Sequence, residues 1–304
     1  MSRGWFKRVA EHGLLLSGLP HLARQWRSRH TIILAYHNIV PNGEQPVGDR
    51  ALHLPQGAFA AQLDALRETH DVISLTEAIE GDALPRRRPR AVITFDDAYG
   101  GAVKYGVAEL CARAMPATIF VTPAFLDGGA FWWDLLTPWG AAAPPARVRQ
   151  YALTAHAGRG DRILADRTLS PGEQPVLPPF SRGAPESELL AAAGKPGITL
   201  ASHSWSHPNL PALEPEELEQ ELFRPLAWLR GHVDSPLPYL SYPYGLSGPR
   251  VESAAEKAGY RAALCIDGGW LHARPERIFA LPRQDVPSGI SLEGFRLRIA
   301  GVLS

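Results

Sequence analysis

The sequence predicts an α/β fold in which parallel strands alternate with helices. Short runs of apolar and β-branched residues are followed by segments with helical periodicity, the pattern of parallel βαβ units. The chain of 304 residues is long enough for one large domain or two small ones. In such folds the functional side chains gather at the carboxyl ends of the strands. The polar residues at or just past the ends of predicted strands are His37, Asp96, Asp97, His203 and Tyr244.

Residues 1–30 predict an amphipathic or surface helix ahead of the main domain, residues 31–304. Their apolar run, GLLLSGLP, is short for a signal peptide, follows Glu11 and His12, and precedes no clear cleavage site. The expected location is therefore the cytoplasm. Because the segment is basic and contains tryptophan, we also consider a weak contact with a membrane surface. The alternative is a helix that packs on the domain.

Seven segments predict strands. TIILAYH (31–37), for example, is short, apolar and β-branched, as a buried strand should be. A further, late strand is expected just before Arg283. The seven segments are 31–37, 71–75, 91–95, 116–122, 198–203, 238–245 and 261–266.

Four segments predict helices between these strands. In 55–70, Phe59, Leu63 and Leu66 recur at the spacing of one helix face. Segment 214–230 has a proline near its start and glutamates in its first turn, and 250–260 has Gly259 as its cap. The fourth segment is 102–114.

Residues 127–197 interrupt the alternation with a long insertion that has no strong strand pattern. Insertions of this length inside a compact domain are usually functional or partly disordered. Its tryptophans allow two interpretations, a wall on which a sugar stacks or an anchor that fixes the insertion to the barrel. They are Trp132, Trp133 and Trp139.

The charge balance and the spacing of the cysteines argue against nucleic-acid binding, a zinc finger and a disulfide framework. Lys+Arg and Asp+Glu are both 31, and this balance argues against nucleic-acid binding through a strongly basic surface. The basic stretch 85–90 is expected to be a solvated turn. Cys111 and Cys265 are too far apart for a zinc finger or a disulfide framework, and both are expected to be small core residues.

Two polar motifs predict a metal site. Asp96 and Asp97 end the strand AVITF, where two adjacent, partly buried carboxylates need a positive partner. His203 and His207 lie four residues apart in SHSWSHPNL. Because Pro208 disfavours a helical conformation at His207, we expect a strand end followed by a tight turn rather than a helix. Imidazole and carboxylate are ligands of zinc and similar cations, and three protein ligands leave room for a catalytic water. One aspartate would then bind the metal while the other accepts a proton from that water.

In this order, TFDD, HSWSH and YPYG resemble the first three motifs of the polysaccharide deacetylases, the NodB homology domain of carbohydrate esterase family 4. LAYHNIV resembles the first strand of the branch that includes poly-N-acetylglucosamine deacetylases and exopolysaccharide-cluster enzymes. The resemblance spans about residues 31–287 and implies a distorted (β/α)7-type barrel, here with its insertion between the Asp-Asp and His-His motifs. It also implies a divalent metal, most commonly Zn²⁺, although the same ligands accept Co²⁺ or Ni²⁺.

Carried over by motif, the resemblance makes Asp96 the catalytic base and Asp97, His203 and His207 the metal ligands. Tyr244 matches the residue whose backbone N–H helps hold the oxyanion.

The sequence departs from the family pattern at two places. Ser241 stands where the family often has an arginine that pairs with the catalytic aspartate, so we assign that pairing to Arg283, with a surface arginine as the alternative. No histidine follows Asp285 to act as the family's general acid, so His37 is the candidate, with a structural histidine as the alternative. Asp267 is a loose match to the acidic residue that orients this acid.

The predicted function is therefore hydrolysis. A metal-dependent enzyme would remove N-acetyl groups from an amino-sugar glycan, either a polysaccharide or a precursor of surface-polymer synthesis. Two alternatives remain open at this point: a catalytically impaired carbohydrate-binding protein on the same fold, and an amide or ester hydrolase with a non-sugar substrate.

Overall fold

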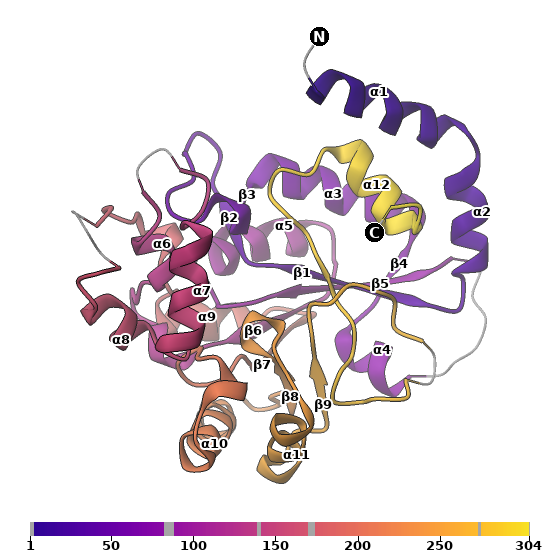
Figure 1. Ribbon diagram of the computed structural model, residues 1–304. Helices are drawn as coiled ribbons and strands as arrows, with labels where there is room; N and C mark the ends of the chain where they lie inside the picture. The colour runs from indigo at the N-terminus through magenta and orange to yellow at the C-terminus, as the bar shows by residue number, and fades with distance from the viewer. Residues whose placement is uncertain (1–2, 82–87, 139–140, 170–173, 273–274, 304) are drawn as a thin grey trace.

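A parallel sheet organises the computed structural model, which describes residues 3–81, 88–138, 141–169, 174–272 and 275–303 (Figure 1). Its strand order is β10-β1-β5-β6-β7-β8-β9, with β4 paired to β5, and all of these pairings are parallel. The strands of this sheet are β1 (Thr31–Tyr36), β4 (Asp71–Val72), β5 (Arg90–Phe95), β6 (Ala117–Val121), β7 (Ile198–Ser202), β8 (Tyr239–Ser241), β9 (Ala262–Leu264) and β10 (Gln284–Asp285). Outside it, β2 (Asn38–Val40) pairs with β3 (His53–Pro55).

Residues 281–285 connect the last strand of this path to the first. Leu281 forms a parallel bridge with Leu264 of β9, and three residues later β10 begins and pairs with β1. The sheet therefore curls into the distorted barrel that the motifs predicted. The predicted late strand lies after Arg283, however, and not before it, because only Gln284 and Asp285 run beside β1.

Helices surround the sheet (Figure 1). None of the described helices combines the length and hydrophobicity needed to span a lipid bilayer. The four predicted helices match α3 (Gln56–Thr69), a π-helix (Ala102–Gly106) followed by α5 (Val107–Ala112), α10 (Pro215–His232) and α11 (Pro249–Ala258). The others are α1 (Arg3–Leu16), α2 (Leu19–Trp26), α4 (Leu75–Glu80), α6 (Trp132–Leu135), α7 (Ala146–Ala155), α8 (Gly160–Ala165), α9 (Glu186–Ala193) and α12 (Leu292–Ala300).

The N-terminal segment forms two helices where one was predicted. Gly18 separates them with φ 76°, a left-handed conformation that glycine adopts without strain. Both helices contact α12 near the other end of the chain (Figure 1). Pro20 is buried on the inner side of α2, so the segment packs on the domain.

Two other expectations need correction. The strand predicted over 71–75 ends at Val72, because Ser74 caps α4 and accepts a hydrogen bond from the Glu77 backbone N–H at 3.1 Å. Cys265 is buried as expected, but Cys111 is exposed because it lies on the outer side of α5. Trp139 and residues 85–87 of the basic stretch lie outside the described residues.

Candidate active site

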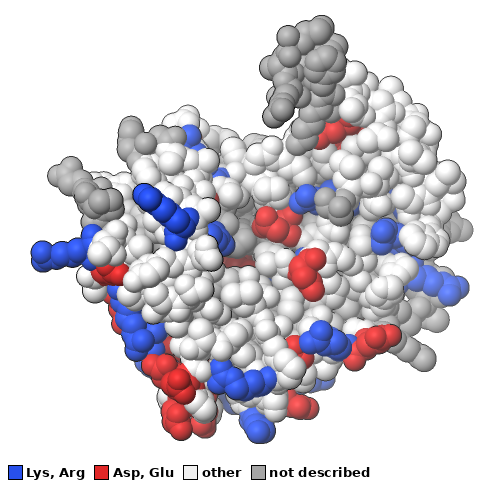
Figure 2. Space-filling model, in the orientation of Figure 1, with Lys and Arg blue, Asp and Glu red and all other residues white. Residues whose placement is uncertain are grey.

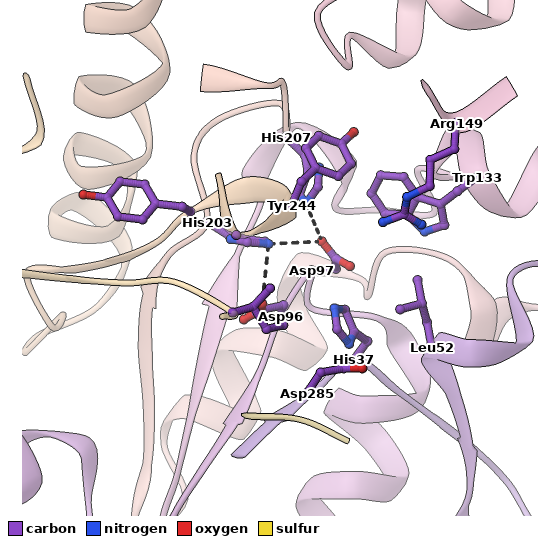
Figure 3. Close-up of a pocket in the computed structure, with 13 residues that line it drawn as sticks. His37, Leu52, Asp96, Asp97, Trp133, Arg149, His203, His207, Tyr244 and Asp285 are labelled. Atoms are coloured by element: carbon purple, nitrogen blue, oxygen red, sulfur yellow. Dashed lines mark ion pairs between the residues drawn. The ribbon is translucent and has the colours of Figure 1, made fainter. Parts of the chain in front are cut away.

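The polar residues that follow the strands meet at one pocket of about 280 Å³ (Figure 3). His37 follows β1, Asp96 and Asp97 follow β5, and His203 follows β7. Because these strands are parallel, their carboxyl ends lie on one side of the sheet and bring these side chains together. Figure 2 shows this face of the molecule hollowed near its centre, with acidic side chains beside the hollow.

The backbone around the pocket adopts unusual conformations. Asp97, Ser204, His207 and Tyr244 have φ values of 72°, 63°, 57° and 58°, the left-handed region that non-glycine residues rarely occupy. The segment after β7 is not helical, as the proline after His207 predicted. Backbone strain of this kind is characteristic of functional sites.

Asp97, His203 and His207 form a donor set that fits a divalent cation. Their ligand atoms lie within 4.8 Å of one another. Asp97 Oδ1 is 3.7 Å from His203 Nε2 and 3.5 Å from His207 Nε2, too far for good hydrogen bonds. Two ligands that each bind zinc at about 2.1 Å with tetrahedral angles lie ~3.4 Å apart, so a cation fits between these atoms. Asp97 Oδ1 is also buried without a hydrogen-bond partner, which a cation would supply.

Electrostatics favour the same conclusion. Burial, then the charges of Asp96 and Asp134, raise the pKa of Asp97 well above its usual range. Burial lowers the pKa of His203 to about 4 and that of His207 well below its usual value, so both imidazoles stay neutral. His203 Nδ1 lies 2.7 Å from the Ser241 carbonyl oxygen, which orients the ring with Nε2 toward Asp97. Two neutral imidazoles beside a buried carboxylate that has no positively charged partner are suited to bind a metal.

Asp96 is held separately by Arg283. The guanidinium donates from Nη1 to Asp96 Oδ1 and from Nη2 to Asp96 Oδ2, both at 2.8 Å, and Arg283 is fully buried. Ser241 Oγ accepts a second hydrogen bond from Arg283 Nη2 at 2.6 Å and itself donates to Asp96 at 3.2 Å. The structure therefore places Arg283 beside the aspartate, and it is not a surface arginine.

This pairing keeps Asp96 ionised. Burial alone would raise its pKa, but the charge of Arg283, together with the hydrogen bonds that Arg283 donates, outweighs burial and lowers the pKa. Asp96 Oδ2 lies 3.8 Å from His203 Nε2, on the border of the metal donor set. The pocket thus holds one aspartate that needs a cation and one that already has its own.

Comparisons with known proteins agree with this arrangement. The family model described as "Polysaccharide deacetylase" matches residues 83–263, more than half of the chain. The chain belongs to the polysaccharide deacetylase family. A search of curated proteins found no match.

Solved structures of deacetylases share the fold of this family member. The Streptococcus pyogenes deacetylase PplD in complex with acetate is 17% identical with a TM-score of 0.58, covering 87% of this chain and 96% of that one. IcaB from Ammonifex degensii is 16% identical with a TM-score of 0.59, covering 90% and 96%. A de-N-acetylase from Aggregatibacter actinomycetemcomitans is 14% identical with a TM-score of 0.59, covering 88% and 98%. At these identities the likeness concerns the fold.

In this deacetylase, His37 lines the pocket on the side of Asp96 and Asp97, and Asp285 at the end of β10 lies next to it (Figure 3). The acidic residue near the candidate acid is therefore Asp285. Asp267, the loose sequence match, does not line this pocket. The sequence argument missed Asp285 although it follows Arg283 by only two residues.

The insertion contributes to the pocket through α6 and α7. Trp133 and Arg149 line it, and Arg149 Nη1 lies 3.7 Å from Asp49 Oδ2. Trp132 is an anchor, because it is buried and its Nε1 donates to the Tyr244 hydroxyl at 2.9 Å. Trp133 is also buried, but one side of it faces the pocket (Figure 3).

A buried hydrogen-bond network behind Trp133 was not predicted from the sequence. Asp134, with no exposed surface, accepts from the Tyr99 hydroxyl at 2.7 Å and from the Asp49 backbone N–H at 2.9 Å, and lies 2.9 Å from His53 Nε2. Tyr99 in turn accepts from Trp133 Nε1 at 2.9 Å. Trp133 contacts the His207 ring edge-on at 4.8 Å, so this network supports a residue of the metal donor set. The adjacent letters WWD were the only signal for it in the sequence.

Proposed function

We propose that this protein is a metal-dependent N-deacetylase that hydrolyses N-acetyl groups of amino sugars in a polysaccharide or a glycan precursor. One observation supports this reaction above all. The same pocket holds a three-residue donor set for a divalent cation and, beside it, a carboxylate kept ionised by a buried arginine. Hydrolysis of an unactivated amide needs both an electrophile for the carbonyl oxygen and an acceptor for the proton of water.

A divalent cation bound by Asp97, His203 and His207 would supply Lewis acidity to the acetyl carbonyl and to a water molecule, and two imidazoles with one carboxylate suit zinc, cobalt or nickel. Asp96 accepts the proton from the attacking water, and Arg283 fixes the direction of both carboxylate oxygens. Tyr244 lines the pocket in a left-handed backbone conformation, and we assign to its backbone N–H a part in holding the developing oxyanion.

The leaving group indicates the function of His37. When the C–N bond breaks, a sugar amine leaves only if it takes up a proton, whereas the carbonyl carbon keeps the new oxygen and departs as acetate. His37 lines the pocket beside Asp285, whose carboxylate can orient the ring. We assign the protonation of the amine to His37.

Membership of the family and the likeness to a de-N-acetylase support an N-acetylated glycan as the substrate. The insertion borders the reaction centre through Trp133 and Arg149, so these side chains are suited to contact the sugar units on either side of the acetamide.

Acetate release from N-acetylglucosamine oligomers tests the proposal. The protein is stripped of metal and compared with and without added zinc, beside the Asp96→Asn variant, with bound zinc measured in each sample. Zinc-dependent release that Asp96→Asn reduces by at least ~10²-fold, at unchanged zinc content, is the expected result. Release that does not depend on the metal, or an Asp96→Asn variant as active as the wild type, would overturn the proposal.

A further inference from the structure

Helices α1 and α2 expose apolar side chains on their outer surface. On α2, exposed apolar residues recur at spacings of three and four, which places them on one face of the helix. On the part of α1 whose side chains the structure describes, from Val9 onward, the two large apolar residues that are exposed lie one heptad apart and share a face as well. The residues of this stripe and their exposed fractions are Val9 (51%), Leu16 (75%), Leu19 (48%), Leu22 (62%) and Trp26 (78%).

Exposed large apolar side chains are concentrated on α1 and α2. Among the described residues, five of the eleven large apolar side chains with substantial exposure belong to these two helices. The opposite side of the pair packs on α12, where Pro20 is buried and Glu11 is 4% exposed. The pair thus exposes large apolar side chains of the kind that a surface helix usually buries, while its carboxylate faces the protein.

Charge distinguishes the same segment. Residues 1–30 contain six Lys or Arg and one Asp or Glu, in a chain whose formal net charge is zero. The one acid is Glu11, which accepts a hydrogen bond from Ser291 Oγ at 2.7 Å. The segment therefore turns its negative charge inward and carries a strong excess of positive charge.

We propose that α1 and α2 dock this protein on the surface of an anionic lipid membrane. An apolar stripe within a basic segment is the pattern of helices that lie in the plane of a bilayer. Trp26 has Arg27 over its ring at 5.5 Å, and an indole beside a long cationic side chain is typical of the water–lipid interface. Attraction to anionic headgroups adds about 1 kcal/mol for each basic residue near the surface.

The charge also argues against a second copy of the chain as the occupant. Two such segments brought face to face would oppose two excesses of positive charge, and like charges across an interface are unfavourable. Both helices lie at the periphery of the molecule, outside α12 (Figure 1), and every side chain of the stripe is exposed to solvent.

Co-sedimentation of the full chain with vesicles tests the proposal. The probes are vesicles of phosphatidylcholine alone and of phosphatidylcholine with phosphatidylglycerol. We expect binding to the anionic vesicles, weaker binding to the neutral ones, and a loss of binding as salt is raised through the range in which surface charges become screened. The double variant Leu22→Ser/Trp26→Ser should bind anionic vesicles at least ~10-fold more weakly.

The matched control is Val176→Ser/Phe223→Ser, which removes two exposed apolar side chains elsewhere, at 90% and 52% exposure. It should bind as the wild type does. Because all four side chains are exposed, both double variants should keep the melting temperature within a few degrees, and this measurement detects misfolding. Three outcomes would overturn the proposal: no binding of the wild type to anionic vesicles, equal loss of binding in both double variants, or a wild-type dimer in solution that Leu22→Ser/Trp26→Ser converts to a monomer.

Discussion

The pairing of Arg283 with Asp96 makes the strongest quantitative prediction. Changing Arg283 to methionine removes two charge-assisted hydrogen bonds of 2.8 Å and leaves Asp96, 2% exposed, without its cation. Removal of one partner of a buried ion pair costs about 3–5 kcal/mol of stability. For a chain of this size that loss lowers the melting temperature by on the order of 10 °C at pH 7.

The same change alters the pH dependence of stability. In the wild type the pKa of Asp96 is held below its unfolded value, so the pair stabilises the fold above that unfolded pKa, and this contribution is lost as pH falls through the folded pKa. In Arg283→Met, no arginine offsets the effect of burial on Asp96. Burial therefore raises the pKa of Asp96 in the folded state above its value in the unfolded state. The ionised aspartate then destabilises the variant at neutral pH, and protonation relieves this as pH falls. The difference in stability between the two proteins should therefore be largest near neutral pH and shrink toward acidic pH.

The pH dependence of activity should reflect the same titration of Asp96. Since Asp96 must be ionised to accept a proton, the acid limb of the kcat/KM profile should move to higher pH in Arg283→Met. Arg283→Lys keeps the charge but loses the two-pronged geometry, so we expect a smaller shift.

The control removes a similar pair at the surface. Arg113 also binds a carboxylate with two nitrogens, to Asp64 at 3.0 and 3.1 Å, but this pair is partly exposed. Arg113→Met should cost only about 0–1 kcal/mol and leave the acid limb unchanged. If Arg283→Met melted within ~2 °C of the wild type and kept its acid limb, the assignment of Arg283 as the partner of Asp96 in solution would be wrong.

Three further predictions concern other parts of the site. His207→Ala should lower the affinity for zinc by at least ~10²-fold in equilibrium dialysis, whereas His156→Ala in the insertion should not change it, and equal zinc binding by both would contradict the donor set. His37→Gln should reduce acetate release from N-acetyl sugars ~10²–10⁴-fold but spare 4-nitrophenyl acetate, whose leaving group needs no proton, and an equal loss on both substrates would indicate a structural histidine. Asp134→Asn should lower stability by ~1–3 kcal/mol and reduce kcat through Trp133, and an effect no larger than that of Asp127→Asn, at an exposed position, would argue against the network.

The part of the site that lies at strand ends could be predicted from the sequence. Asp96, Asp97, His203 and His207 each follow a short apolar strand, and parallel strands bring their carboxyl ends to one edge whatever the length of chain between them. The insertion of residues 127–197 separates the two motifs along the chain but not in space, because β5 and β7 both flank β6. Strand periodicity was therefore enough to predict that these side chains lie close together, whereas their roles were assigned from the motif resemblance.

The supporting residues could not be predicted in this way. Asp134, Tyr99 and His53 lie on three separate segments, and their contacts depend on how the insertion folds back over β2 and β3. Neither helical nor strand periodicity reports such contacts. The error at 71–75 has a different cause: Ser74 and Glu77 form a helix-start signal that was present in the sequence, but the apolar letters around it suggested a strand.

Arg283 shows that the cation paired with the catalytic aspartate can come from a different position in the sequence while the chemistry of the site is kept. Asp96 is buried and ionised, so the barrel must supply a cation at that point, and the family pattern often supplies it from the position that is Ser241 here. A serine leaves space, and the segment that connects β9 to β1 directs Arg283 into the barrel, where its Nε also donates to the Cys265 carbonyl oxygen at 3.2 Å. Ser241 Oγ then bonds both Arg283 and Asp96, so the position that lost the arginine still orients the pair. The absent motif arginine is thus weak evidence for lost catalysis, because the charge that Asp96 requires is present on a neighbouring strand connection.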